Sequence, residues 1–519
     1  MKIELYDTTL RDGAQKIGIS FSLKDKLKIA QKLDEFGFDY IEGGWPASNP
    51  KDSEFFNKIK SLNLNHSKVV AFGMTKRKEI RASDDFNLKE LLKAETEIVT
   101  IFGKTWDLHV RDVLKTSLKE NLSIIKESCR FLTSHNKRVF YDAEHFFDGF
   151  KANSKYALLT LEAAVAGGAE RIILCDTNGG SLPWEIRKIV NEVKKKIKVP
   201  LGIHTHNDSG LSVANSLEAI KCGVSQIQGT INGYGERCGN LDFCVIIPTL
   251  QLKMGVKCLQ NSQLSALTEL SRFVYEIANL PPDSSQPYVG INAFSHKGGV
   301  HADAMTKNKK TYQHIDPSLV GNFSKIAVSE LSGKANILTK ISDFSLNSSK
   351  IPEKLPIVLD KIKKLESKGF QFENADASLE LLIRRILGNY HPPFKILDLN
   401  VSINKKKNYF ASRAKIKLQI KNKIVETNED GKGPVNALDR AIRRALLPFY
   451  PKLKNIRLTN YSVRILDSKE GTAAWVRVLI DTTDSYGRTW TTIGSSFNII
   501  EASFKALIDS IEYAILKQG

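Results

Sequence analysis

Short apolar runs alternate with longer amphipathic stretches over the first half of the chain. Up to about residue 255, each β-branched or aromatic run is followed by a stretch whose apolar positions recur at helical spacing. The pattern occurs eight times, and the predicted strands are residues 3–8, 40–44, 69–73, 98–102, 139–142, 172–176, 201–206 and 226–231. Eight parallel strands with intervening helices in about 250 residues specify a closed TIM barrel, with an open doubly wound sheet as the weaker alternative.

The pattern changes twice after the predicted barrel. From about 256 to 370, helical stretches alternate with breaks rich in Gly, Ser and Asn, which indicates a helical linker region. Strands followed by a helix then occur twice, and residues 435–442 parallel residues 500–507 at the opening of each helix. We therefore predict a TIM-barrel catalytic domain over 1–270, helical linker subdomains over 271–370 and a pseudo-symmetric α+β domain over 371–519.

Composition narrows the class of protein. A chain of 519 residues is too long for one compact domain, and none of its apolar runs approaches the length of a membrane span. The N-terminus leads directly into a predicted strand without a signal segment, so the expected location is the cytoplasm. Six scattered cysteines without a CxxC pair indicate buried thiols rather than disulfides or a thiolate zinc site.

The chain is strongly basic, with a formal net charge of +19. Such a field could attract nucleic acid, acidic membranes or an anionic cofactor. However, the basic residues are dispersed rather than gathered on one helix or interleaved with stacking aromatics. We interpret most of the charge as solvated surface and expect neither a nucleic-acid nor a membrane partner.

Two histidines stand at the end of the seventh predicted strand. The period of two along a strand points His204 and His206 to the same side, although any strand can hold such a pair. Asp12 follows the first strand, so a closed barrel would bring its carboxylate to the same carboxyl rim, where barrel active sites are built. This mixed set suits a divalent ion such as zinc, manganese, magnesium or cobalt.

Further polar residues fall on or just after predicted strands: Arg11, Glu42, Glu144 and Thr177. Buried charges cost on the order of several kcal/mol unless they are paired, so charged residues at strand ends imply mutual pairing or function. A Gly-rich loop, residues 233–240, follows the eighth strand and could receive an anion at its amides. It lacks the Lys-Ser/Thr of a P-loop.

Three motifs taken together resemble the DRE-TIM metallolyase superfamily. They are DTTLRDG at residues 7–13, HTHND at 204–208 and GERCGN at 235–240. The chain is most similar to the acyltransferase branch of 2-isopropylmalate, homocitrate and citramalate synthases, over essentially its whole length. Residues 42–52, 140–149 and 296–301 resemble the longer type of citramalate synthase.

One departure from a related subfamily is informative. Isopropylmalate synthases usually read Glu-Val-Gly-Phe-Pro where this chain has Glu42-Gly43-Gly44-Trp45-Pro46. This difference argues against the bulkier acceptor of those enzymes.

The resemblance implies an acyltransferase that condenses acetyl-coenzyme A with pyruvate and then hydrolyses the thioester to citramalate, in isoleucine biosynthesis. The alternative is 2-isopropylmalate or homocitrate synthase activity. By the same resemblance, the divalent metal would bind Asp12, His204 and His206, with Asn240 as a further direct or water-mediated ligand. Arg11 would stabilise the developing alkoxide, and Thr177 and Glu42 would help to bind the substrate.

The resemblance also implies catalytic residues outside the barrel. His301 matches the catalytic histidine of the family and Tyr312 its tyrosine partner, and His301 with Glu144 would remove the acetyl methyl proton. Because His301 and Tyr312 lie in the linker region, we expect a homodimer in which these two residues reach the active site of the neighbouring subunit. The repeated C-terminal unit resembles the regulatory domain of the family, with isoleucine as the implied effector.

A lyase of the same superfamily, which cleaves a hydroxyacyl-coenzyme A, is the rival within the fold. It would use a similar barrel and metal but would not need residues 371–519. The Cys-containing lid loop of the hydroxymethylglutaryl lyases also has no convincing match in this sequence.

Overall fold

The computed structural model of the chain describes residues 2–326, 328, 333–347, 349–388, 390–406 and 409–517. It contains two compact units. The first comprises Met1–Phe294 and Ile315–Ser324, and the second comprises Ser295–His314 and Lys325–Gly519. Among the described residues, no helix combines the length and the apolarity that crossing a membrane requires.

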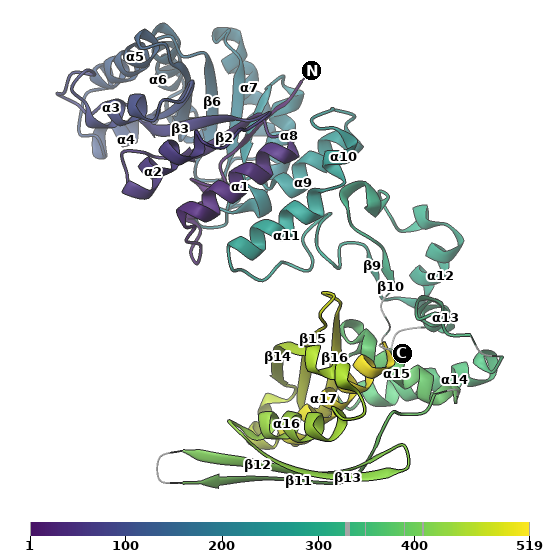
Figure 1. The fold of residues 1–519 in the computed structure, drawn as a ribbon. Coiled ribbons are helices and arrows are strands. Elements are labelled where there is room, and N and C mark those ends of the chain that lie inside the picture. The colour runs from purple at the N-terminus through teal and green to yellow at the C-terminus, as the bar shows by residue number, and fades with distance from the viewer. Residues whose placement is uncertain are drawn as a thin grey trace. The chain divides into compact units, whose positions relative to one another are not determined.

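The first unit is built on a closed barrel of eight parallel strands in the order β1 to β8 (Figure 1), which confirms the predicted fold. The strands are β1 Glu4–Asp7, β2 Tyr40–Gly44, β3 Lys68–Met74, β4 Ile98–Lys104, β5 Arg138–Glu144, β6 Arg171–Asp176, β7 Leu201–Thr205 and β8 Gln226–Gly229. β1 pairs with β2 on one side and with β8 on the other, so the sheet has no free edge. The predicted strands agree with these bounds to within two residues at each end.

Helices surround the barrel and cover its outer face. They are α1 Leu23–Phe36, α2 Pro50–Ile59, α3 Phe86–Lys93, α4 Asp107–Asp112, α5 Leu118–Ser134, α6 Phe146–Ala166, α7 Pro183–Lys196 and α8 Ser212–Lys221. After β8 follow α9 Phe243–Pro248, α10 Asn261–Leu264 and α11 Leu267–Ile277. Local signals set their ends: the Ser22 hydroxyl caps α1 in a capping box, and Gly37 ends it with a φ of 98°.

Side chains fill the lower part of the barrel interior. The rings of Tyr6, Tyr40 and Phe140, from β1, β2 and β5, are all buried, with centroids 5.4–6.5 Å apart. Below them, Arg171 forms an ion pair with Glu4 at 2.5 Å across the amino-terminal end of the barrel. These contacts close one end, so the open space lies at the carboxyl ends of the strands.

The second unit begins with a short parallel pair of strands and four helices. These are β9 Ser295–His296, β10 Lys325–Ile326, α12 Gly299–Lys307, α13 Lys334–Asp343, α14 Ile351–Glu366 and α15 Asp376–Leu387. The predicted linker is therefore mainly helical, and the two-residue strands are an addition to it.

Two copies of a three-stranded antiparallel sheet followed by a helix complete the second unit. The first copy is β11 Lys395–Lys405, β12 Phe410–Ile420, β13 Lys423–Gly431 and α16 Pro434–Leu446. The second is β14 Arg457–Ile465, β15 Val476–Thr483, β16 Thr489–Ser496 and α17 Ile499–Leu516. The predicted pseudo-symmetric α+β region is confirmed. α16 packs on β12 and β13, and α17 packs on β15 and β16.

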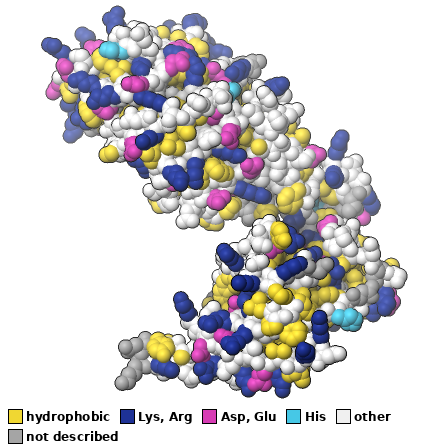
Figure 2. All heavy atoms as spheres, viewed as in Figure 1, with side chains coloured by type: hydrophobic (Ala, Val, Ile, Leu, Met, Phe, Trp, Pro, Cys, Tyr) yellow, Lys and Arg dark blue, Asp and Glu magenta, His cyan; other side chains and the backbone are white. Residues whose placement is uncertain are grey.

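Basic side chains are scattered over the face of the molecule drawn in Figure 2. On the face drawn in Figure 2, Lys and Arg are interspersed with acidic and uncharged side chains rather than collected in one patch. On this face the basic side chains therefore form no continuous patch.

Candidate active site

A cavity of about 210 Å³ opens at the carboxyl ends of the barrel strands. Its lining includes six residues that the sequence predicted as site residues: Arg11, Asp12, Glu144, Thr177, His204 and His206. They lie at or just after the ends of β1, β5, β6 and β7. Polar groups that are far apart in the chain thus meet at one mouth of the barrel, the rim at which this fold places active sites.

Asp12, His204 and His206 lie close enough to share one cation. Their candidate ligand atoms are all within 4.8 Å of one another. The two histidine Nε2 atoms are 3.3 Å apart, and Oδ2 of Asp12 is 3.6 Å from Nε2 of His204. All three side chains are buried. One carboxylate and two imidazoles form a mixed oxygen and nitrogen ligand set that suits a divalent metal.

The backbone after β8 brings Asn240 to this cluster. An isolated antiparallel bridge pairs Asn240 with His206, and the Nδ2 of Asn240 donates to Oδ1 of Asp12 at 2.9 Å. Gly239 makes the turn with a φ of 94°, and a Cβ there would lie 2.0 Å from the carbonyl oxygen of Gly233. The Gly-rich loop therefore serves close backbone packing, which positions Asn240 beside Asp12.

A second layer of polar residues orients His204. Its Nδ1 is 3.0 Å from Oε1 of Gln228, whose Nε2 donates to Oδ1 of Asp142 at 3.2 Å. Because the amide nitrogen of Gln228 is directed at Asp142, its oxygen faces His204 and accepts from Nδ1–H. The Nε2 lone pair of His204 is then left free to face the cation site.

The electrostatics of the cluster favour the protonation states that bind metal. Burial alone would raise the pKa of Asp12, but the positive charge of Arg11, with the hydrogen bond from Asn240, lowers this pKa to about 2. Burial lowers the pKa of His204, and it lowers the pKa of His206 to about 3. At neutral pH the site therefore presents a carboxylate and two neutral imidazoles.

Two buried atoms at the cluster have no hydrogen-bond partner among the described residues. They are Nδ1 of His206 and Oδ1 of Asn240. Buried polar atoms in native proteins are normally satisfied by protein, water or an ion. Together with the donor set, this observation indicates that the residues fit a divalent cation.

Arg11 is held rigidly next to this cluster. Its Nε donates to Oε1 of Glu42 at 2.5 Å, and its Nη1 donates to Oδ2 of Asp12 at 3.0 Å. Its Cζ lies 3.7 Å from the centre of the Phe72 ring. Glu42 is fully buried beneath the cavity, where it also accepts from the hydroxyl of Tyr6 at 2.6 Å. The structure thus places Glu42 behind Arg11 and not among the residues that line the cavity.

Glu144 and Thr177 border the cavity on another side. Glu144, at the end of β5, forms an ion pair with Lys104 at the end of β4. Oγ1 of Thr177 accepts from the backbone N–H of His145 at 2.9 Å. Because this oxygen is already an acceptor, the hydroxyl hydrogen of Thr177 is left to donate to another group.

Three aromatic side chains form a wall of the cavity. Phe72 and Phe102 stack with their ring centroids 5.5 Å apart, and Trp45 meets Phe102 edge-on at 5.7 Å. Two hydrogen bonds fix Trp45, from its Nε1 to Oδ1 of Asn87 at 2.7 Å and from its backbone N to Oδ2 of Asp52 at 3.0 Å. This wall restricts the space beside Arg11 and favours a small substrate.

His301 and Tyr312 lie in the second unit, where they contact each other. Their rings stack with centroids 4.2 Å apart and an interplanar angle of 27°. His301 lies on α12, and Tyr312 follows the short turn Lys309–Thr311. His296 completes an aromatic cluster, with ring centroids 6.5 Å from His301 and 6.1 Å from Tyr312.

Four further residues of the site were not predicted individually from the sequence: Lys104, Asp142, Gln228 and Trp45. Lys104 and Asp142 stand near the carboxyl ends of β4 and β5, so the strand-end rule that selected Arg11 could have selected them too. Burial, followed by the charge of Glu42, raises the pKa of Asp142 well above its ordinary range. Gln228 is a buried polar residue in a short strand, a signal that a sequence pattern does not separate from an exposed one.

Models of known families match consecutive parts of the chain. The HMGL-like model matches residues 2–274. The model described as homocitrate synthase post-HMGL domain-like matches residues 288–369, and the model of the LeuA allosteric (dimerisation) domain matches residues 373–515.

Several curated proteins are similar to the chain over nearly its whole length. An (R)-citramalate synthase of Geobacter sulfurreducens is 52% identical, with 99% of this chain and 98% of that protein covered. An (R)-citramalate synthase of Aquifex aeolicus is 51% identical with the same coverage. A 2-isopropylmalate synthase of Methanocaldococcus jannaschii is 32% identical, with 100% and 95% covered.

Proposed function

Because this chain belongs to the HMGL-like family and, over its full length, to the (R)-citramalate synthases, we propose that it condenses acetyl-coenzyme A with pyruvate at the carboxyl rim of its barrel. It is an acyltransferase that converts the acyl group into an alkyl group on transfer. The observation that carries the proposal is the meeting of Asp12, His204 and His206 beside Arg11 in one small cavity.

The metal would be held by Asp12, His204 and His206, with Asn240 near enough to act as a direct or water-mediated ligand. A divalent ion such as zinc, manganese, magnesium or cobalt, held by these residues, would supply a Lewis acid for the keto group of the acceptor. Gln228 holds the His204 tautomer in which Nε2 carries the lone pair. The role of Gln228 is therefore to position a ligand.

Arg11 supplies a fixed positive charge for the condensation. Glu42 and Asp12 fix its guanidinium before the reaction, so no reorganisation is needed when negative charge develops on the former keto oxygen. Thr177 binds the acceptor carboxylate with its remaining hydroxyl hydrogen. Glu42 contributes to substrate binding through Arg11, since its own oxygens face protein groups.

We assign removal of the acetyl methyl proton to His301 together with Glu144. Imidazole is the commonest general base in enzymes, and the stacked ring of Tyr312 restrains that of His301. The new carbon–carbon bond then forms between the methyl carbon and the keto carbon of pyruvate. Water hydrolyses the thioester to citramalate and coenzyme A, which makes the condensation effectively irreversible.

We assign catalysis to residues 1–270 and a linker that carries the catalytic histidine to residues 271–370. We assign regulation and dimerisation to residues 371–519. The match to an allosteric (dimerisation) domain over residues 373–515 supports a homodimer. Isoleucine, as the end product, is the proposed effector.

All six cysteines are free thiols, which supports a location in the reducing cytoplasm.

The acceptor can be identified by following coenzyme A release with a thiol reagent. The reaction contains acetyl-coenzyme A, a divalent ion and one of pyruvate, 2-oxoisovalerate or 2-oxoglutarate. We expect pyruvate to give the highest kcat/KM, because the aromatic wall leaves little room for a larger side chain. A higher kcat/KM with 2-oxoisovalerate would instead indicate 2-isopropylmalate synthase activity, and with 2-oxoglutarate homocitrate synthase activity.

Replacing Phe102 by alanine should relax this preference. Removing the ring opens space beside Arg11, and differences of one or a few methylenes in an apolar pocket change kcat/KM by about 10–200-fold. We therefore expect the ratio of kcat/KM for 2-oxoisovalerate to that for pyruvate to rise by at least about tenfold. Phe86→Ala is the matched control, since Phe86 is 61% exposed. An unchanged ratio in Phe102→Ala would remove this ring from the acceptor site.

A further inference from the structure

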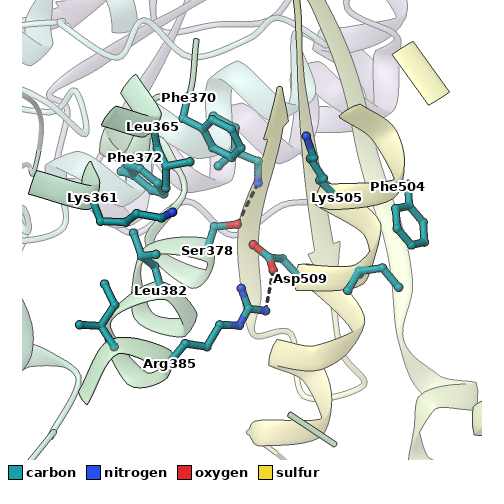
Figure 3. Close-up of a pocket in the computed structure, with 13 residues that line it drawn as sticks. Lys361, Leu365, Phe370, Phe372, Ser378, Leu382, Arg385, Phe504, Lys505 and Asp509 are labelled. Carbon is teal, nitrogen blue, oxygen red and sulfur yellow. Dashed lines mark hydrogen bonds and ion pairs between the residues drawn. The ribbon is translucent and has the colours of Figure 1, made fainter. Parts of the chain in front are cut away.

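Backbone strain distinguishes the walls of two cavities. No residue that lines the cavity of about 500 Å³ between α14, α15 and α17 (Figure 3) has a positive φ. At the active-site cavity, Arg237 in the wall has a φ of 54°, and His145, which follows Glu144 in the chain, has a φ of 56°. Residues other than glycine keep such a backbone only where their surroundings hold it, and strained residues of this kind cluster at functional sites.

His145 joins the end of β5 to the start of α6. Its φ and ψ of 56° and 31° lie in the left-handed region, and its backbone N–H donates to Oγ1 of Thr177 at 2.9 Å. The start of α6 is fixed by packing, since Phe146 and Phe147 are fully buried. Relaxation of His145 to a negative φ would therefore require rotation of the planar peptide between residues 144 and 145, and this rotation would turn the N–H away from Thr177.

Ring contacts hold the side chain of His145, which is 12% exposed. Its ring centroid lies 4.4 Å from that of His109, which it meets at 71°, and 6.0 Å from that of Trp106. The absence of a side chain at Gly149 allows α6 to approach this region closely, because a Cβ there would lie 2.8 Å from the carbonyl oxygen of Thr105. The imidazole is thus enclosed and has little room to follow a change of backbone conformation.

A carboxylate links the same side chain to the segment after β6. Nδ1 of His145 lies 3.4 Å from Oδ2 of Asp148, and this oxygen also accepts from Nδ2 of Asn178 at 2.9 Å. Asn178 directly follows Thr177. His145 is therefore connected to two consecutive residues, to Thr177 through its backbone and to Asn178 through its side chain and Asp148.

We propose that His145 is a positioning residue for the acceptor of the condensation. The contacts of its side chain keep its backbone left-handed, and the N–H so directed holds Oγ1 of Thr177 with the hydroxyl hydrogen turned toward the acceptor carboxylate. The inference rests on the proposed function, in which Thr177 binds this carboxylate. Because the contact serves binding and not the chemical step, its loss should raise KM for the acceptor rather than lower kcat.

The test is a pair of amide substitutions in the full-length protein, His145→Gln and His145→Asn. Asparagine tolerates a left-handed backbone, whereas glutamine, which is closer to histidine in size, adopts it poorly. With acetyl-coenzyme A and a divalent ion at saturation, we expect KM for pyruvate to rise at least about tenfold in His145→Gln, as for loss of a hydrogen bond to a charged group. His145→Asn should stay within about threefold of the wild type. In both variants kcat and KM for acetyl-coenzyme A should change little.

Two further substitutions separate this role from a general structural one. Thr177→Val should itself raise KM for pyruvate, and adding His145→Gln to it should cause little further change, because both act through one hydroxyl. Asn136→Ala is the matched control, since Asn136 is exposed and has a φ of 59° just before the start of β5. Alanine is strained at a positive φ, so this variant should have a lower melting temperature but an unchanged KM for pyruvate.

Thermal denaturation checks the fold of each variant, and His145→Ala replaces His145→Gln if the latter does not fold. Equal KM for pyruvate in His145→Gln and His145→Asn, an unchanged KM in Thr177→Val, or additive effects in the double variant would each overturn the proposal. So would a fall of kcat at unchanged KM, which would mean that His145 acts on Glu144 instead. Absence of pyruvate turnover in the wild type would overturn the proposed function, and this inference with it.

Discussion

Replacing His204 by alanine should reduce turnover by more than about 1,000-fold, a larger loss than the 10–100-fold typical of an outer-shell residue. Its Nε2 faces His206 and Asp12, and its Nδ1 is engaged by Gln228, so both ring nitrogens serve the cluster. The measurements are kcat with pyruvate and the metal content of the purified protein by mass spectrometry.

The fold should survive this substitution, because the apolar packing of the barrel does not involve the imidazole of His204. Circular dichroism and the melting temperature check this point. His66→Ala, on an exposed histidine of the same unit, is the matched control and should retain full activity. Wild-type turnover in a folded His204→Ala variant would exclude this histidine from the metal site.

Replacing Arg11 by glutamine should lower kcat by about 100–1,000-fold, the range for removal of one preorganised group that stabilises an oxyanion. The same change leaves Glu42 buried without its cationic partner, which costs about 3–5 kcal/mol of stability. Two separate effects are therefore expected from one substitution, on kcat and on the free energy of unfolding.

The double variant Arg11→Gln with Glu42→Gln separates these effects. Neutralising Glu42 removes the unpaired charge, so stability should recover in large part while kcat stays low. Arg138→Gln is the control for loss of an arginine ion pair far from the cavity, at the start of β5. If the double variant recovered kcat together with stability, the loss in the single variant would be structural and Arg11 would have no role in the chemistry.

The barrel could be predicted from the sequence because each strand of a parallel barrel is covered on both faces. This burial produces compact apolar runs such as residues 172–175 of β6, a strand that is buried at every position. The convergence of Asp12 with His204 and His206 followed from the closed topology, because the carboxyl ends of parallel strands share one rim.

Other features of the site required coordinates. The hydrogen bond from Gln228 to Asp142 joins residues 86 positions apart, and nothing in the local pattern of either strand pairs them. The ion pair between Lys104 and Glu144 depends on the register of β4 with β5, which places these two residues opposite each other. The short strands β9 and β10 are too brief for a period of two to be visible.

The rings of Tyr6, Tyr40 and Phe140, with the Glu4–Arg171 ion pair beneath them, close one end of the barrel, so its interior is entered from the other end. Substrates and products must enter and leave through the same open end, so a product that dissociates slowly delays binding of the next acceptor. Substitutions in the loops at the open end can therefore change specificity without disturbing the closed end. Substitutions at the closed end can change stability without affecting the reaction.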